Sequence, residues 1–364
     1  MSTALLERLR IALPILQAPM AGVSTPALAA AVSNAGALGA IALGASRSDD
    51  ARAMIERTRA LTNAPFNVNV FCHRAPTRDA AREAAWLQRI APEFASLGLS
   101  LPDRLVPVYA SFRGDAAMLE MLLALRPAVV SAHFGLPDSG QCAALRAAGI
   151  VVLATATSLN EARAIEDAGL DAIVAQGIEA GGHRGVFDPD AADACLSTAT
   201  LTRLLVQRTG LPVIAAGGIM DGAGIRAALA LGAAAAQLGT AFVACPESAA
   251  SSSHRAALGD TRAATRMTRV LSGRPARGFA NRFTRTYDTS AGAPAPAYPL
   301  AYDATRRLAA AAAQVGQADA YAAQWAGQGA PLARPLPAAA LVVRLAEELQ
   351  DASGIGDGGA RTRA

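Results

Sequence analysis

Short apolar runs alternate with longer helical stretches from the N-terminus to about residue 245, and this rhythm limits the fold more than any other feature of the chain. Runs of Val, Ile, Leu and Ala without polar alternation are typical of strands buried on both faces of a parallel sheet. The strand candidates are Ile15–Ala18, Ala37–Ala42, Asn67–Phe71, Val106–Phe112, Ala128–His133, Val151–Ala156, Ala172–Gln176, Val213–Ala216 and Ala235–Leu238. Their alternation with helices predicts an α/β fold.

Polar residues and glycines follow nearly every one of these runs, which favours a closed (β/α)8 barrel over an open doubly wound sheet. A barrel of this kind has eight strands, and the chain offers nine candidates. Val106–Phe112 lies within a long excursion between His73 and Arg126, so we interpret it as the extra run.

The rhythm ends after Ser248. Serine-rich, Pro/Ala-rich and alanine-rich stretches then predict a smaller, mostly helical cap. Near the end of the chain Leu341, Val342, Leu345 and Leu349 share one face of an amphipathic helix that could return to close the barrel. The predicted division is a barrel at 1–248, a cap at 249–333, the returning helix at 334–350 and a disordered tail at 351–364.

Composition excludes several classes of protein. No apolar run approaches 18 residues and Met1–Arg10 lacks a signal-peptide core, so we expect a cytoplasmic protein that does not bind membranes. Every basic residue is arginine, which excludes a P-loop lysine and Schiff-base chemistry. The net charge of +4 and the scattered arginines indicate solvated helix faces rather than a nucleic-acid surface. The four cysteines have no C-x-x-C spacing, so we expect reduced core residues and no metal site.

The loop Gln176–Gly185 carries His183 among small residues, directly after a buried-strand pattern. Small residues let a flat ligand lie against the backbone, and a neutral imidazole there is suited to removing a proton from an activated carbon. Glu179 and Arg184 are close in sequence, but sequence alone does not place them as its partners.

The other histidines are less distinctive. His133 ends a strand pattern, so the barrel rule places it toward the catalytic face. His73 begins a loop and is compatible with either a structural or an active-site role. His254 follows a serine run and is expected to be exposed.

Two further loops, Gly217–Gly218 and Gly239–Thr240, follow the last two strand patterns. Phosphate is often held at this position of a barrel, and glycine N–H groups with a helix beginning near Asp221 would form an anion nest without lysine. The alternative is that these glycines only make tight turns between strand and helix.

Polar side chains at other strand ends add weaker signals. Met20 follows the first strand among small residues, and Asn67 and Asn69 project to the same side of the third. Those amides and Gln176 could bind a ligand heterocycle, or pair with a neighbouring strand or water.

Together these strings resemble the bacterial class I nitronate monooxygenases. The resemblance rests on motifs that occur in the family's order: Gln17–Gly22, Pro65–Asn69, Ser131–Gly135, Gln176–Gly185, Ala215–Ile219, Gly239–Phe242, Tyr298–Tyr302 and Trp325–Gly329. It implies an FMN-binding TIM barrel with a helical cap that oxidises alkyl nitronates, such as propionate 3-nitronate, with O2 to an aldehyde or oxo acid plus nitrite or nitrate. It implies single-electron transfer to flavin without NAD(P)H, in a monomer or homodimer.

The resemblance also assigns roles by matching positions. His183 would be the base toward neutral nitroalkanes. The substrate pocket would contain Tyr109, His133, Tyr298, Tyr302 and Arg306. FMN would be held by Met20, Ala21, Gly22, Asn69, Gln176, Gly181, Gly217, Gly218, Gln237, Gly239 and Thr240. Arg306 stands where the family usually has lysine, which bears on carboxylated substrates.

Two other functions are compatible with the same barrel. An NAD(P)H-dependent flavin reductase, acting on quinones or enoyl-acyl-carrier-protein, would require a reduced nicotinamide. A non-catalytic sensor of flavin or a phosphate ligand would bind without turnover, and fold alone does not decide between them.

Overall fold

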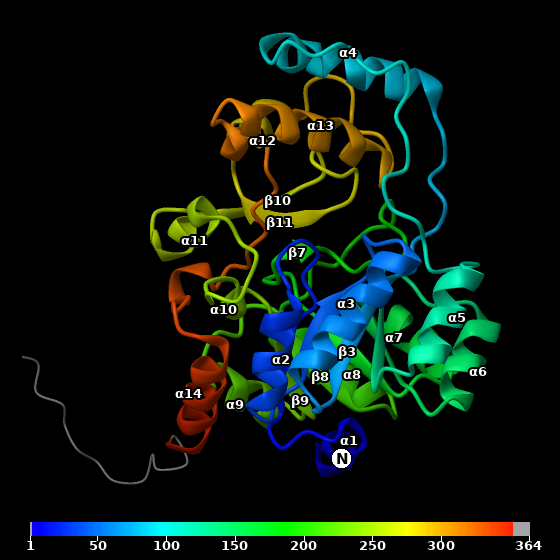
Figure 1. Cartoon of the computed structure of the whole chain (residues 1–364), viewed down its shortest axis with the longest axis vertical. Helices are drawn as coiled ribbons and strands as arrows, with labels where there is room; N and C mark the ends of the chain where they lie inside the picture. The colour runs from blue at the N-terminus through cyan, green and yellow to red at the C-terminus, as the bar shows by residue number, and fades with distance from the viewer. Residues whose placement is uncertain (1, 352–364) are drawn as a thin grey trace, which may run out of the picture.

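Eight parallel strands form a closed barrel at the centre of the computed structural model, which describes residues 2–351 (Figure 1). They are β1 (Ile15–Gln17), β2 (Gly39–Ala42), β3 (Phe66–Phe71), β4 (Val129–His133), β5 (Val151–Ala156), β6 (Ala172–Gln176), β8 (Val213–Ala216) and β9 (Ala235–Leu238). The sheet order is β1-β9-β8-β6-β5-β4-β3-β2, and a parallel bridge between Leu16 and Leu38 closes the ring. The predicted barrel is confirmed, and Val106–Phe112 is not one of its strands.

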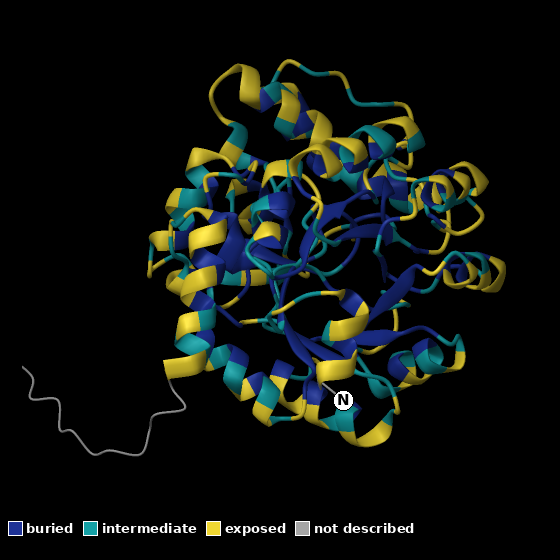
Figure 2. Cartoon of the chain, turned by 60° about the horizontal axis from the view of Figure 1, so that its bottom comes forward, coloured by how far each residue is buried: buried dark blue, intermediate teal, exposed yellow. Residues whose placement is uncertain are grey.

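Helices surround the barrel and leave its strands buried, as Figure 2 shows. They are α1 (Ser2–Leu9), α2 (Pro26–Asn34), α3 (Ser48–Leu61), α4 (Ala80–Ser96), α5 (Ala116–Leu125), α6 (Ser139–Ala147), α7 (Leu159–Asp167), α8 (Thr198–Arg208), α9 (Gly222–Ala230) and α10 (Thr240–Val243). Side-chain caps fix where several of them begin: the side chains of Thr25, Asp115, Ser158 and Asp221 each accept a backbone N–H three residues further on. Asp221 thus confirms the predicted helix start.

The amino-terminal end of the barrel is closed by α1. Leu5 and Leu9 are fully buried against interior residues such as Val129, Leu153 and Ile214. This end is therefore packed with aliphatic side chains, and ligand space is left only toward the carboxyl ends of the strands.

A cap covers those carboxyl ends. It contains α11 (Ser252–Gly259), β10 (Thr265–Thr268), β11 (Ala276–Phe279), α12 (Arg282–Tyr287), α13 (Leu300–Gln314) and the short helices η1 (Ala318–Ala320) and η2 (Ala330–Leu332). A small antiparallel sheet runs through it in the order β10-β11-β7, and β7 (Gly182–His183) comes from the barrel loop. The cap therefore shares backbone hydrogen bonds with the loop Gln176–Gly185, which carries His183.

The long excursion after β3 also belongs physically to the cap. Trp86 and Phe94 of α4 pack with Phe283 and Leu308 in one apolar cluster, and Figure 1 shows α4 beyond α13. Glu93 of α4 joins this cluster to the cap by accepting hydrogen bonds from Arg282 and from the Tyr321 hydroxyl.

The last helix, α14 (Ala338–Asp351), returns to the outside of the barrel beside α9 and α2. Leu341, Val342 and Leu345 are buried there, and Glu348 Oε2 accepts the N–H of Gly222 at the start of α9. The cap is thus an insertion between β9 and this last helix. The predicted tail from residue 352 onward lies outside the described residues.

Candidate active site

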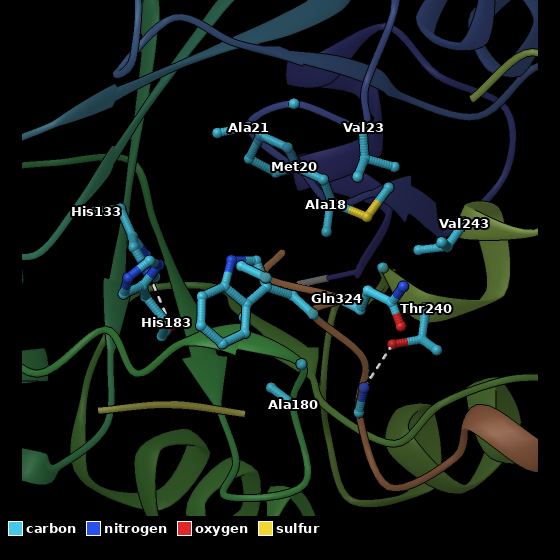
Figure 3. A pocket seen from close by; sticks show the side chains of 18 of the residues that line it. Ala18, Met20, Ala21, Val23, His133, Ala180, His183, Thr240, Val243 and Gln324 are labelled. Atoms are coloured by element: carbon cyan, nitrogen blue, oxygen red, sulfur yellow. Dashed lines mark hydrogen bonds between the residues drawn. The ribbon is translucent and has the colours of Figure 1, made fainter. Parts of the chain in front are cut away.

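A cavity of about 660 Å³ lies between the carboxyl ends of the strands and the cap. That volume is in the ordinary range for a cofactor or small-molecule site. Every residue predicted for the site lines it: Met20, Ala21, Gly22, Asn69, Tyr109, His133, Gln176, Gly181, His183, Gly217, Gly218, Gln237, Gly239, Thr240, Tyr298, Tyr302 and Arg306. In Figure 3, His133 and His183 lie at one end and Thr240 and Val243 at the other, with Met20 and Ala21 along a wall between them.

Backbone groups of two glycines contribute to the end of the cavity near Thr240, beside the side chains of Thr240, Val243 and Gln324 (Figure 3). Gly217 and Gly218 have φ of +127° and +70°, conformations that L side chains rarely adopt. The N–H groups of Gly218 and Ile219 donate to no acceptor among the described residues. This is the geometry of an anion nest, and it fits the predicted phosphate.

Close backbone contacts flatten one side of the cavity. A Cβ placed on Gly181 would lie 2.5 Å from the backbone nitrogen of Gly327, so only glycine permits this approach. The Gly327 N–H in turn donates to Thr240 Oγ1 at 2.9 Å. The hydroxyl hydrogen of Thr240 is left to donate to a ligand.

His183 lies at the other end of the cavity, on β7. Its Nε2 is 2.9 Å from the Ser272 hydroxyl, and its ring centroid lies 5.2 Å from that of Trp325 and 5.5 Å from that of Tyr298. Burial lowers its pKa to about 3, with the nearby Arg274 cation and His133 adding to the effect. The imidazole is therefore neutral at physiological pH.

His133 supports the His183 backbone. Its Nε2 lies 3.2 Å from the carbonyl oxygen of His183, which can only accept, so Nε2 carries the proton. Its Nδ1 then accepts from the Thr155 hydroxyl at 3.0 Å. Burial lowers the pKa of His133 to about 4. Both ring nitrogens are thus engaged within the protein, although the ring lines the cavity.

The strand amides are also engaged. Gln176 Nε2 donates to the His183 carbonyl at 3.0 Å, and its Oε1 accepts the Gly185 N–H at 2.7 Å. Asn69 Nδ2 donates to Ser131, while its Oδ1 has no hydrogen-bond partner among the described residues. Gln176 therefore holds the loop that carries His183, and Asn69 retains one free acceptor.

Three tyrosines and Arg306 form a second wall. The ring of Tyr109 lies 5.6 Å from that of Tyr302, and the Arg306 guanidinium lies 5.6 Å from the Tyr109 ring centroid. Burial raises the pKa of all three phenols, so they remain protonated donors. The Tyr298 hydroxyl is buried without a partner among the described residues and is therefore available to a ligand.

Among the described residues, no Asp or Glu side chain lines the cavity, and Arg306 is the one permanently charged residue that does. An anionic ligand would meet no carboxylate there. Three expectations need correction: His254 is buried on α11 and lines the cavity, Cys195 is exposed, and Arg184, Arg274 and Arg277 are buried rather than on solvated faces. Arg184 pairs with Asp193, and Glu179 accepts from Thr198, so neither binds the His183 ring.

Sequence reasoning missed Ser272 and Arg274 entirely. Both lie on the turn between β10 and β11, 89 residues or more from His183 in sequence. The Arg274 guanidinium stacks over Phe134 at 4.2 Å from the ring centroid and donates to the Val186 carbonyl. The string Ser272-Gly-Arg274 is present in the sequence before a strand. Nothing in that string indicates which barrel residue its side chains contact.

Within residues 2–351, no three His, Cys, Asp or Glu side chains gather in a way that could hold a metal ion. In the same part of the chain, no helix has the length and apolar character needed to cross a membrane.

Comparison with known proteins gives a consistent result. A family model described as nitronate monooxygenase matches residues 2–348. Proteins named nitronate monooxygenase from Paraburkholderia phytofirmans and Pseudomonas aeruginosa are 58% and 57% identical, covering 95% and 93% of this chain and 95% and 96% of their own.

Solved structures agree with these relatives. Nitroalkane oxidase from Streptomyces ansochromogenes superposes with a TM-score of 0.87 and is 45% identical, covering 97% of this chain and 99% of its own. FabK from Thermotoga maritima has a TM-score of 0.72 and 28% identity, covering 96% of both chains.

Proposed function

The chain belongs to the nitronate monooxygenase family of flavin-dependent oxidoreductases, and from that premise we propose that it oxidises alkyl nitronates with O2 in an FMN-containing active site. The products would be an aldehyde or oxo acid with nitrite or nitrate. The observation that supports this best is one cavity with a glycine nest at one end and a neutral histidine among tyrosines at the other.

The residues present fit FMN. The unpaired N–H groups at Gly218 and Ile219 suit a phosphate, and the small residues Ala21, Gly22 and Gly181 leave space for a flat ring. When bound, the flavin supplies the electron acceptor for the substrate. The cofactor residues would be Met20, Ala21, Gly22, Asn69, Gln176, Gly181, Gly217, Gly218, Gln237, Gly239 and Thr240.

The protein's own contribution is position and charge. His183 would take a proton from a neutral nitroalkane, and the resulting imidazolium would stabilise the nitronate anion. Tyr298 would donate its unpaired hydroxyl to the same anion. Tyr109, Tyr302 and Arg306 would bind the rest of the substrate, while His133 would contact it only through ring carbons, because both its nitrogens are engaged.

Oxygen uptake by the FMN-loaded enzyme with propionate 3-nitronate, without NADH, tests the proposal. We expect rapid uptake with release of nitrite or nitrate. No uptake together with anaerobic bleaching of the flavin by NADH would assign a reductase instead. Bound flavin with neither reaction would assign a sensor. A cytoplasmic location and a monomeric or homodimeric state stay predictions.

A further inference from the structure

Ser272 makes the only side-chain hydrogen bond to the His183 ring within residues 2–351. Its side chain is fully buried on the turn between β10 and β11. Its Oγ lies 2.9 Å from His183 Nε2, 3.2 Å from the carbonyl oxygen of Arg274 and 3.3 Å from the backbone nitrogen of Arg274. A single hydroxyl therefore serves three neighbours.

The hydrogen-bonding capacity of a hydroxyl decides how these contacts are satisfied. A serine has one O–H to donate and two lone pairs that accept. The Arg274 carbonyl can only accept and the Arg274 N–H can only donate. All three contacts are made at once if the O–H donates to the carbonyl and Oγ accepts from both the Arg274 N–H and His183 Nε2–H. If the O–H instead donated to Nε2, the buried contact with the carbonyl would be lost.

The surroundings hold the ring in this orientation. β7 pairs with β11 in a register that places His183 opposite Ala276, and the His183 carbonyl accepts from both His133 and Gln176. Phe134 and Trp325 lie against the ring at centroid distances of 5.6 and 5.2 Å. A rotated ring would break the bond to Ser272.

The opposite nitrogen is the one that is open. His183 Nδ1 has no hydrogen-bond partner among the described residues. It is not one of the polar atoms that are both unpartnered and fully buried in the protein. The lowered pKa of His183 means that the ring carries a single proton at physiological pH. With that proton on Nε2, the lone pair on Nδ1 faces the cavity.

We propose that Ser272 is a positioning residue that holds His183 in the Nε2–H tautomer, which makes Nδ1 the atom that accepts the proton. The C–H bond next to the nitro group breaks, its proton forms the Nδ1–H bond, and its electron pair passes into the nitro group to give the nitronate. Nε2–H keeps its bond to Ser272 throughout. The proton-transfer step rests on the proposed function. The assignment of the tautomer is independent of that function.

Nitrogen-15 NMR of the FMN-loaded enzyme with labelled histidine tests the tautomer directly. The chain has four histidines, so the spectrum is simple, and a His183→Asn variant assigns the His183 signals. We expect a protonated Nε2 and an unprotonated Nδ1 in the unaltered enzyme. A protonated Nδ1 would overturn the proposal whether or not any variant folds.

Ser272→Ala then tests the role of the hydroxyl. We expect a mixture of tautomers, a fall of about 10- to 100-fold in kcat/KM for nitroethane, and a change below about threefold for preformed ethyl nitronate. Ser272→Thr, which keeps a hydroxyl, should restore the native tautomer signal. His183 signals that stay unchanged in Ser272→Ala would overturn the role of Ser272.

Ser33→Ala is a matched control. Ser33 is also buried, donates to the Pro65 carbonyl and accepts the Gly39 N–H, but it lies away from the cavity. The Ser33→Ala substitution should lower the free energy of unfolding. It should change neither the His183 signals nor the ratio of kcat/KM for nitroethane to kcat/KM for ethyl nitronate. If nitronate oxidation is absent while Nε2–H is observed, the proposed function fails and the tautomer assignment stands.

Discussion

The two ends of the cavity are built from different parts of the chain. The glycine nest near Thr240 uses backbone groups of the loop after β8, which is contiguous with a barrel strand, while Gln324 and Gly327 of the cap also reach this end. The end near His183 uses side chains that come from a barrel loop, the excursion after β3 and the cap. The glycine nest of the first end is local in sequence, whereas the second end exists only when distant segments pack together.

This difference separates two kinds of dependence. A glycine nest depends on permitted φ values, which a few residues determine on their own. The protonation and hydrogen bonding of the His183 ring depend on its burial and on Ser272 and Arg274. Neither of these two residues lies near His183 in sequence. The following predictions perturb one end at a time, from the largest expected effect to the smallest.

His183→Asn should lower kcat/KM for neutral nitroethane by about 10³-fold, because general-base catalysis contributes about 10²- to 10⁴-fold. Preformed ethyl nitronate needs no deprotonation and should react within about tenfold of the unaltered rate. Oxygen-uptake kinetics on both substrates measure this ratio. Equal losses on the two substrates would assign His183 to binding instead of proton transfer.

Acid should lower the free energy of unfolding through the two buried histidines at one end of the cavity, and not through the glycine end. The folded pKa values of His133 and His183, about 4 and about 3, lie below the unfolded value of about 6.5. The unfolded state therefore binds more protons below pH 6.5, and stability falls as pH drops from there toward 4 and 3. At pH 5 each buried histidine should cost about 2 kcal/mol of unfolding free energy.

Urea unfolding at pH 7.5 and pH 5.0, with FMN held at one concentration, measures that loss. His133→Asn should make the dependence on pH shallower, since it removes one titrating group. An unfolding free energy at pH 5.0 that equals or exceeds the value at pH 7.5 would contradict the neutral, buried state of both rings.

Gly218→Ala should weaken FMN binding about tenfold. A Cβ forced into this positive-φ conformation costs about 1–2 kcal/mol, so the loop would relax and have to be re-formed on binding. Fluorescence titration of the apoprotein with FMN gives the Kd.

Gly149→Ala is the matched control for that experiment. Gly149 has a similar φ of +77° and free space around its Cα, but it follows α6 outside the cavity. It should lose comparable stability with an unchanged Kd for FMN. An increased Kd in Gly149→Ala, or an unchanged one in Gly218→Ala, would remove the argument for a phosphate nest.

Arg306→Met should raise the KM for propionate 3-nitronate about threefold to tenfold, because the one permanent cation on the cavity wall would be lost. Ethyl nitronate, which has no carboxylate, should keep its KM within about twofold. Arg306→Lys should lie close to the unaltered enzyme for both substrates. Parallel changes for the two substrates would assign Arg306 to packing on Tyr109.

The same division explains what the sequence could predict. The eight barrel strands, the helix start at Asp221 and the returning helix α14 follow from local patterns of apolar, capping and glycine residues. The positions of Gly217, Gly218 and His183 followed from the rule that loops after barrel strands form the site. The fold, the glycine nest and His183 could therefore be predicted from the residues themselves, whereas Tyr109, Tyr298, Tyr302 and Arg306 were expected only from the family resemblance.

The misses at His254 and Arg274 involve contacts across the tertiary structure. His254 was expected to be exposed because a serine run precedes it, yet its Nε2–H donates to the Trp325 carbonyl oxygen at 3.1 Å and the residue is buried. Arg274 is buried because aromatic faces and backbone carbonyls replace water around its guanidinium. No pattern within ten or twenty residues encodes such partners.

The pairing of β7 with β11 has a consequence for how molecules enter and leave. Because His183 and Gly182 pair with Ala276 and Arg277 in the ladder, a hinge-like opening of the cap as one rigid lid would pull His183 away from its place in the cavity. Entry and exit that leave His183 in place would instead need local rearrangements at the rim of the cavity. The pairing of β7 with β11 thus couples the position of His183 mechanically to the cap.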